Sequence, residues 1–273
     1  MKDLRIALIQ SDIIPDDSAA NLAALEPLLA KHFGDMTDAS PPDLIVLPEV
    51  FTTGFHPRAR QHAELPEGPA SQWLMEQAKR YGAAITGSVV FARGASPRGE
   101  HTAHHTNRLL WASPDQPLQH YDKRHLFRMA GEHERYQPGR QRTLVNLKGW
   151  RVLLQVCYDL RFPVFSRNRD DYDIALYVAN WPAVRHDHWR TLLKARAIEN
   201  QAYVIGVNRV GHDAYGQDYA GGSVVFSPLG EVLADAANLP GVLTAQLSEA
   251  DLRSYRERFP AHLDADDFSL IID

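Results

Sequence analysis

Short apolar runs alternate with helix-forming segments along almost the whole chain of 273 residues, and this alternation restricts the fold more than any other feature. The runs at 44–47, 152–156 and 174–178 are four or five residues long and mostly apolar. Such runs are typical of strands that are buried on both faces. Between the runs lie segments such as 17–33, in which leucines recur at helical spacing. The pattern predicts an α/β fold.

The remaining elements follow from the same two patterns. Further strands are expected at 4–10, 83–91, 106–112, 203–207, 222–226 and 242–246, and further helices at 71–81 and 188–201. Ser248 and Asp251 have the spacing of a capping box, so we expect a last helix that Pro260 ends. No repeat or low-complexity tract divides the chain, and 44% hydrophobic residues suffice for one large core. We therefore predict one domain, residues 1–273, in which 260–273 form a C-terminal tail.

Charge and cysteine content exclude several classes of protein. A formal net charge of −5 and an isoelectric point near 6.2 argue against a nucleic-acid partner, which requires a basic surface. No apolar run approaches the roughly 18 residues that a membrane span needs, and the first residues lack the apolar segment of a signal peptide. A single cysteine cannot form an intramolecular disulfide. We expect a cytoplasmic protein without a membrane partner, whose thiol stays reduced.

The one cysteine, Cys157, lies where the run 152–156 ends and a charged turn begins. A residue at the carboxyl end of a buried strand is presented to a crevice, which suits a nucleophile. Two other polar residues have similar positions: Glu49 comes soon after the run 44–47, and Lys123 ends a short extended stretch. Each of them alone is also compatible with a structural or solvated role. Together, a carboxylate, an ammonium and a thiol form a chemically complete set for cleaving an amide.

Three motifs in this order resemble the nitrilase superfamily of carbon–nitrogen hydrolases. They are Leu47-Pro48-Glu49 with Phe51 and Gly54, then Tyr121-Asp122-Lys123-Arg124-His125-Leu126-Phe127, then Val156-Cys157-Tyr158-Asp159-Leu160-Arg161-Phe162-Pro163. Further matching segments are Ala179-Asn180-Trp181-Pro182, Arg196-Ala197-Ile198-Glu199-Asn200, Gly206-Val207-Asn208-Arg209 and Gly221-Gly222-Ser223. The resemblance runs from about residue 4 to 268. It implies a four-layer α-β-β-α sandwich, subunits that pair through helices into a homodimer, and a tail that can reach the partner subunit.

The chemistry of amide cleavage explains why these residue types belong together. A thiol with an ordinary pKa of about 8.5 is mostly protonated at neutral pH, so Cys157 needs a base, and Glu49 is expected to be that base. Lys123 and the backbone N–H of Tyr158 would stabilise the negative oxygen that forms when the thiol attacks. Ammonia then leaves, and water hydrolyses the thioester with Glu49 again as base. The scheme requires no metal and no organic cofactor.

A further carboxylate belongs to the pattern of the family, and two glutamates compete for its place. Glu132 and Glu134 both precede the turn Pro138-Gly139. Glu132 is preferred because family members carry their glutamate at this spacing, and a second carboxylate beside Lys123 would keep the ammonium charged. Glu134 is the alternative, although a solvated carboxylate suits it better.

The short motifs are most similar to those of the omega-amidase branch, which hydrolyses the terminal amide of 2-oxoglutaramate and 2-oxosuccinamate. Such a small anionic amide needs a planar cation, and Arg161 resembles the carboxylate-binding arginine of the family. Trp181 would form the apolar wall of the pocket. Alternatively, Arg161 is a structural residue bound to a loop carboxylate such as Asp159. Deaminated glutathione, N-carbamoyl compounds and nitriles remain alternative substrates, and a non-catalytic interaction protein is a remote alternative.

A cluster of histidines carries no metal-site prediction. His101, His104 and His105 lie in a segment rich in Gly, Ser, Pro and Arg, with Glu100 as the one acidic neighbour. Because such a segment supplies no fixed ligand geometry, we interpret it as a surface loop. The chain also lacks the glycine patterns of serine hydrolases and nucleotide-binding proteins.

Overall fold

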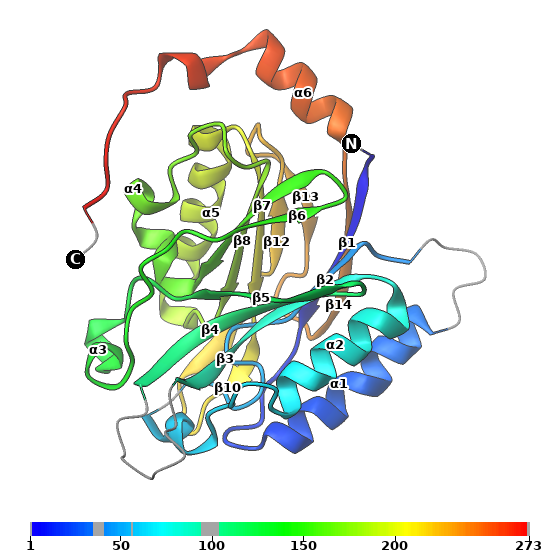
Figure 1. The fold of residues 1–273 in the computed structure, drawn as a ribbon, viewed down its shortest axis with the longest axis vertical. Helices are drawn as coiled ribbons and strands as arrows, with labels where there is room; N and C mark the ends of the chain where they lie inside the picture. Colours follow the sequence, from blue (N-terminus) through cyan, green and yellow to red (C-terminus); the bar gives the residue numbers. More distant parts are fainter. Residues whose placement is uncertain (1, 35–40, 56, 94–103, 272–273) are drawn as a thin grey trace.

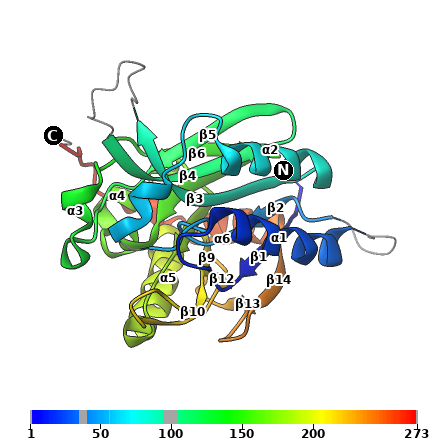
Figure 2. The same cartoon turned by 90° about the horizontal axis from the view of Figure 1, so that it is seen from below.

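Two six-stranded sheets are stacked face to face, and helices cover both outer faces (Figure 1 and Figure 2). The computed structural model describes residues 2–34, 41–55, 57–93 and 104–271. The expected α/β fold and the four-layer α-β-β-α sandwich are confirmed.

The first sheet has the strand order β14-β1-β2-β3-β4-β5, and the second has the order β13-β12-β9-β8-β7-β6. The strands of the first are β1 (Leu4–Gln10), β2 (Leu44–Val46), β3 (Ala84–Arg93), β4 (His104–Ser113), β5 (Gln116–Asp122) and β14 (Gly241–Leu247). Those of the second are β6 (Leu144–Leu147), β7 (Trp150–Val156), β8 (Ile174–Ala179), β9 (Tyr203–Asn208), β12 (Val224–Phe226) and β13 (Val232–Asp235). A separate hairpin joins β10 (Val210–His212) to β11 (Asp218–Ala220).

Both faces of the central strands are buried, which explains their continuous apolar runs. In β1, Ile6 and Leu8 face the second sheet and belong to the central core, whereas Ala7 and Ile9 face the outer helices. All four are fully buried. Helices α1 (Ser18–Phe33) and α2 (Pro69–Tyr81) cover this outer face side by side (Figure 1).

Helix α5 (His186–Asn200) covers the outer face of the second sheet. Its Trp189 and Leu193 pack against β9 at Gly206, where an added Cβ would lie 2.4 Å from Leu193 Cδ1 and 2.9 Å from the indole of Trp189. Only a glycine permits this close approach of helix and sheet. Two further helices of one turn, α3 (Glu132–Arg135) and α4 (Pro163–Ser166), lie in the loops near the carboxyl ends of the strands.

Most predicted elements are present, and their predicted ends lie within two residues of the observed ones. The strand expected at 222–226 begins at Val224, because Gly221 and Gly222 have φ angles of 67° and 77° and cannot extend it. The interpretation of the histidine cluster as a loop is wrong for His104 and His105, which begin β4 and pair with β3. His101 lies outside the described residues. Strands β6, β13 and the β10–β11 hairpin were not predicted, since they are short and partly exposed.

The last helix, α6 (Glu249–Arg258), begins as predicted: Ser248 Oγ accepts a hydrogen bond from Asp251 N at 3.2 Å. Between Pro260 and Ile271, the last residue that the structure describes, the only helix is one 3-10 turn at Ala261–Asp264. Phe268 of this tail lies against the guanidinium of Arg169, with 4.2 Å between Cζ and the ring centroid. A contact between the tail and a partner subunit stays a prediction. None of the helices in the described part of the chain has an apolar stretch long enough to cross a membrane.

Candidate active site

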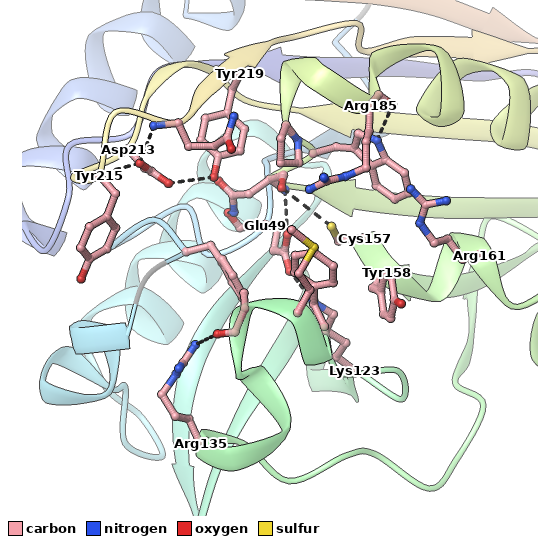
Figure 3. Close-up of a pocket in the computed structure, with 18 residues that line it drawn as sticks. Glu49, Lys123, Arg135, Cys157, Tyr158, Arg161, Arg185, Asp213, Tyr215 and Tyr219 are labelled. Carbon is pink, nitrogen blue, oxygen red and sulfur yellow. Dashed lines mark hydrogen bonds and ion pairs between the residues drawn. The ribbon is translucent and has the colours of Figure 1, made fainter.

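The ends of strands from both sheets meet at one pocket of about 440 Å³ (Figure 3). Glu49 comes after β2 and Lys123 after β5, both in the first sheet, whereas Cys157 follows β7 in the second sheet. All three side chains line the pocket. The fold thus brings together three residues that are separated by as many as 108 positions in the sequence (157 − 49).

The ammonium group of Lys123 lies between two buried carboxylates. Nζ donates to Glu49 Oε1 at 2.9 Å and to Glu132 Oε1 at 3.0 Å. Burial alone would lower the pKa of Lys123, but the charges of Glu132 and Glu49 outweigh burial and hold this pKa well above its ordinary value. Its backbone is also fixed, because Gly139 N donates to Lys123 O at 2.9 Å. Lys123 is therefore a permanently charged and immobile cation in the pocket wall.

Of the two candidate glutamates, Glu132 is the one beside Lys123. Its side chain is fully buried, and Oε2 accepts a hydrogen bond from Phe127 N at 2.5 Å. Burial raises the pKa of Glu132, although the charge of Lys123 opposes this shift. The side chain of Glu134 is 72% exposed and lies 3.8 Å from His133. The geometry agrees with the preference for Glu132 and leaves Glu134 as a solvated residue.

Hydrogen bonds hold both carboxylate oxygens of Glu49. Oε1 also accepts from Asn107 Nδ2 at 2.8 Å, and Oε2 accepts from Asn180 N at 2.7 Å. In return, Asn180 Nδ2 donates to Glu49 O at 2.7 Å. The next residue, Val50, has a φ of 44°, a strained conformation for a β-branched side chain, and its N–H donates to Ser88 Oγ at 2.8 Å. The carboxylate is thus held in one orientation by groups from both sheets.

Cys157 lies at a sharp turn between β7 and the 3-10 helix η3 (Cys157–Arg161). Its φ of 46° is in the left-handed region, which a non-glycine residue rarely adopts. The thiol is partly buried, and its Sγ lies 4.0 Å from Asn180 O. Burial, the charge of Glu49 and a hydrogen bond with Glu49 raise the pKa of this thiol well above its ordinary value, although Lys123 lowers it. The resting sulfur is therefore protonated at neutral pH, and a role as nucleophile would require a base.

Asp159 ties the turn after β7 to the segment that carries Lys123. Its buried carboxylate accepts from Val156 N at 2.9 Å and from the hydroxyl of Tyr121 at 2.8 Å. His125 adds its backbone N–H and its ring Nδ1, both at 2.8 Å. Because these groups occupy both carboxylate oxygens, the alternative in which Asp159 holds Arg161 is wrong.

Tyr158, Arg161 and Trp181 line the same pocket. The guanidinium of Arg161 lies over the buried indole of Trp181, with 4.8 Å between Cζ and the ring centroid. One of its nitrogens is 3.2 Å from His188 Nδ1. The ring of Tyr158 packs against Phe127 at a centroid distance of 5.0 Å. These side chains form an aromatic wall that carries a cation.

Three residues that shape the site were not among the predicted site residues: Asn107, Asn180 and Asp159. Asn180 directly follows β8, a position like that of Cys157 after β7, so the same signal could have identified it. Asn107 is a buried polar residue inside a buried strand, which is a weaker signal of a site residue. Nothing in the sequence distinguishes Asp159 from an ordinary loop carboxylate. In the ranges that the structure covers, no group of three or more His, Cys, Asp or Glu side chains could hold a metal ion.

Comparison with known proteins identifies the class of this enzyme. The family model for carbon–nitrogen hydrolases matches residues 5–257. The protein therefore belongs to the carbon–nitrogen hydrolase family, and it is a hydrolase of carbon–nitrogen bonds other than peptide bonds. The resemblance to the nitrilase superfamily is confirmed.

Several relatives are similar over their full length. Omega-amidase YafV of Yersinia enterocolitica is 50% identical over 99% of this chain and 100% of the relative. Omega-amidase YafV of Escherichia coli K12 is 47% identical, with the same coverage of 99% and 100%. The 2-oxoglutaramate amidase of Bacillus subtilis is 30% identical over 93% of this chain and 95% of the relative. Among solved structures, XC1258 of Xanthomonas campestris, a CN-hydrolase superfamily protein with an arsenic adduct in its active site, has a TM-score of 0.91 and 48% identity, covering 99% of this chain and 100% of its own.

Proposed function

We propose that this protein is an omega-amidase, which hydrolyses the terminal amide of small 2-oxo dicarboxylic acid monoamides such as 2-oxoglutaramate and 2-oxosuccinamate. The observation that carries the proposal is the buried Glu49–Lys123–Glu132 cluster beside the thiol of Cys157, at a pocket with an arginine on its aromatic wall. The relatives named omega-amidase and 2-oxoglutaramate amidase support the same substrate class.

Acylation begins with proton transfer from the thiol of Cys157 to the carboxylate of Glu49. The sulfur forms a bond to the amide carbon, and the electron pair of the C=O bond moves to oxygen. The ammonium of Lys123 and the N–H of Tyr158 stabilise this oxyanion. When the pair returns, the C–N bond breaks, and the proton on Glu49 passes to the nitrogen that leaves as ammonia. A thioester remains on the enzyme.

In deacylation, water is the nucleophile and the sulfur of Cys157 is the leaving group. Glu49 removes a proton from water, and the oxygen attacks the thioester carbon. A second oxyanion forms at the same position and collapses, the C–S bond breaks, and the proton held by Glu49 returns to the sulfur of Cys157. Because the thiol is not ionised at rest, acylation requires Glu49 as a base, and deacylation requires it again to activate water.

Substrate recognition rests on the pocket beyond the nucleophile. We infer that Arg161 binds the distal carboxylate, because its guanidinium faces the pocket and Asp159, the nearest alternative partner in the sequence, is fully occupied. Trp181 supports the guanidinium and covers the apolar part of the substrate. A volume of about 440 Å³ is ample for a substrate of this size.

Ammonia release from a panel of compounds tests the proposed function. The panel contains 2-oxoglutaramate, 2-oxosuccinamate, deaminated glutathione, an N-carbamoyl amino acid, an aliphatic nitrile and pentanamide. We expect kcat/KM for 2-oxoglutaramate to exceed that for pentanamide at least about 100-fold, since charge-assisted contacts to the acid end each contribute roughly ten-fold or more. Equal turnover of uncharged amides or nitriles would overturn the proposal.

Several broader properties belong to the same proposal. We propose that residues 1–273 form one domain, which is supported by the pairing of β1 with β14 from opposite ends of the chain. A homodimer that pairs through helices and a cytoplasmic location complete the proposal, along with a small anionic amide as substrate and no nucleic-acid or membrane partner. Sedimentation analysis of the purified protein tests the dimer directly.

A further inference from the structure

A second arginine faces the same pocket from the turn before α5. Arg185 lines the pocket and lies over the ring of Phe127, with 5.6 Å between Cζ and the ring centroid. Its backbone is fixed, because Trp181 Nε1 donates to Arg185 O at 2.7 Å. Among the described residues, no carboxylate pairs with its guanidinium in a hydrogen bond or ion pair. A contact with an aromatic face requires no acceptor oxygen, so the N–H donors of Arg185 can bind another group.

Arg185 and Arg161 share a wall that is built from aromatic rings. Trp181 connects the two arginines, since its ring lies under the Arg161 guanidinium while its N–H holds the backbone of Arg185. Figure 3 shows both arginines on one side of Cys157, with Asp213 and Tyr215 on the opposite side. One side of the pocket therefore presents two cations.

The carboxylate on the opposite wall does not form an ion pair with either arginine. Asp213 Oδ1 accepts from the backbone N–H groups of Tyr215 and Gln217, both at 2.9 Å, and Oδ2 accepts from the hydroxyl of Tyr219 at 3.2 Å. This carboxylate is thus used to hold the β10–β11 hairpin. Arg135, the third arginine that lines the pocket, donates to Ala130 O at 2.5 Å and serves its own loop.

We propose that Arg185 is a second specificity-determining residue, which together with Arg161 holds the 2-oxo acid end of the substrate and selects 2-oxo acid monoamides over the corresponding 2-amino acids. This inference rests on the proposed function. A 2-oxo acid presents three oxygen atoms in one plane, two from the carboxylate and one from the ketone, and two planar guanidinium groups supply donors to all of them.

The same arrangement disfavours glutamine. Glutamine has the carbon chain and terminal amide of 2-oxoglutaramate, but its 2-position carries an ammonium instead of a ketone oxygen. An ammonium has no acceptor, and like charges a few ångströms apart in a partly dry pocket repel one another. The guanidinium that binds the ketone oxygen therefore repels the amino acid, and discrimination combines an attractive with a repulsive element.

Steady-state kinetics of Arg185→Gln and Arg185→Lys test the role of this residue. Three substrates are compared: 2-oxoglutaramate, glutamine, and pentanamide, which lacks the acid end. Val184→Ala serves as the control, because Val184 is adjacent and 75% exposed and has no part in the site. Circular dichroism and urea unfolding of each variant establish that the fold is retained.

We expect Arg185→Gln to lower kcat/KM for 2-oxoglutaramate by about ten- to one-hundred-fold, mainly through KM, as for the loss of one charge-assisted contact. Turnover of pentanamide should change less than about three-fold, and the preference for 2-oxoglutaramate over glutamine should fall at least about ten-fold. Arg185→Lys should retain part of the preference because it keeps the charge without the planar fork.

Two results would refute the role of Arg185 and leave the proposed function intact. In one, Arg185→Gln retains wild-type selectivity among the three substrates; in the other, all three substrates lose activity equally, which indicates a general structural role. If the wild-type enzyme does not prefer 2-oxoglutaramate to pentanamide, the proposed function itself fails, and this inference fails with it. The wild-type measurement therefore separates the two failures.

Discussion

Replacing Glu132 with glutamine should remove most of the activity while the protein remains folded. The glutamate makes two contacts: Lys123 Nζ at 3.0 Å and Phe127 N at 2.5 Å. Glutamine has the same shape and keeps one acceptor oxygen, but its NH₂ group opposes one of the two donors. Loss of one partner from a buried ion pair costs about 3–5 kcal/mol, and the retained acceptor places the expected loss in unfolding free energy near 2–4 kcal/mol. That is less than a typical total stability of roughly 5–15 kcal/mol.

The catalytic effect follows from the freedom that Lys123 gains. With one carboxylate left, the ammonium is no longer held between two fixed anions, so its alignment with the oxyanion is lost. If about 3–4 kcal/mol of this alignment is lost from the transition state, kcat falls by about 10²–10³. Ammonia release at saturating 2-oxoglutaramate measures kcat, and urea unfolding measures stability.

Glu134→Gln is the matched control, because Glu134 is two residues away in the same short helix and its side chain is 72% exposed. This variant should keep kcat within about two-fold of wild type, as expected for a surface position. Similar losses in the two variants, or a Glu132→Gln enzyme with near wild-type kcat, would refute the assignment of Glu132 to the catalytic cluster.

Three further predictions address the nucleophile and its support. Cys157→Ala should remain folded and lose turnover by several orders of magnitude, as in other covalent mechanisms; residual turnover above about 1% would exclude Cys157 as nucleophile. Burial and Glu49 raise the pKa of the thiol, so iodoacetamide should alkylate Cys157 slowly at pH 7. The alkylation rate, followed by intact-protein mass spectrometry, should still increase at pH values above the ordinary thiol pKa. A rate that levels off below pH of about 8 contradicts the raised pKa. In Asp159→Asn, the new NH₂ group faces at least one of the buried groups that now donate to the Asp159 carboxylate. The unfolding free energy, measured in urea, should therefore fall by about 2–4 kcal/mol. A change below about 0.5 kcal/mol would show that Asp159 does not hold the two segments together.

The local pattern of the chain was sufficient for the fold class, and three motifs that resemble the nitrilase superfamily supplied the candidate nucleophile, base and cation. A strand that is buried on both faces requires a continuous apolar run, so β2, β7 and β8 can be identified from the sequence. The polar residues that follow these runs can be identified in the same way. The resemblance to the family, whose members carry a glutamate at this spacing before the Pro138-Gly139 turn, favoured Glu132. Short and half-exposed strands such as β6 carry no such run, and they were missed for this reason.

Contacts between the two sheets could not be read from the chain, because they depend on distances between segments far apart in sequence. The partner of Asp159 is such a case: local spacing left Arg161 open as an alternative partner, whereas the carboxylate binds Tyr121 and His125, which belong to the other sheet and the loop after it. Protonation of the nucleophile is another, since the pKa of Cys157 reflects its burial and the nearness of Glu49. A pattern within one element indicates which face is buried, but only the packed structure decides which groups lie opposite that face. Hydrogen bonds and charges act over a few ångströms in space rather than along the sequence, so the contacts of the site depend on this packing.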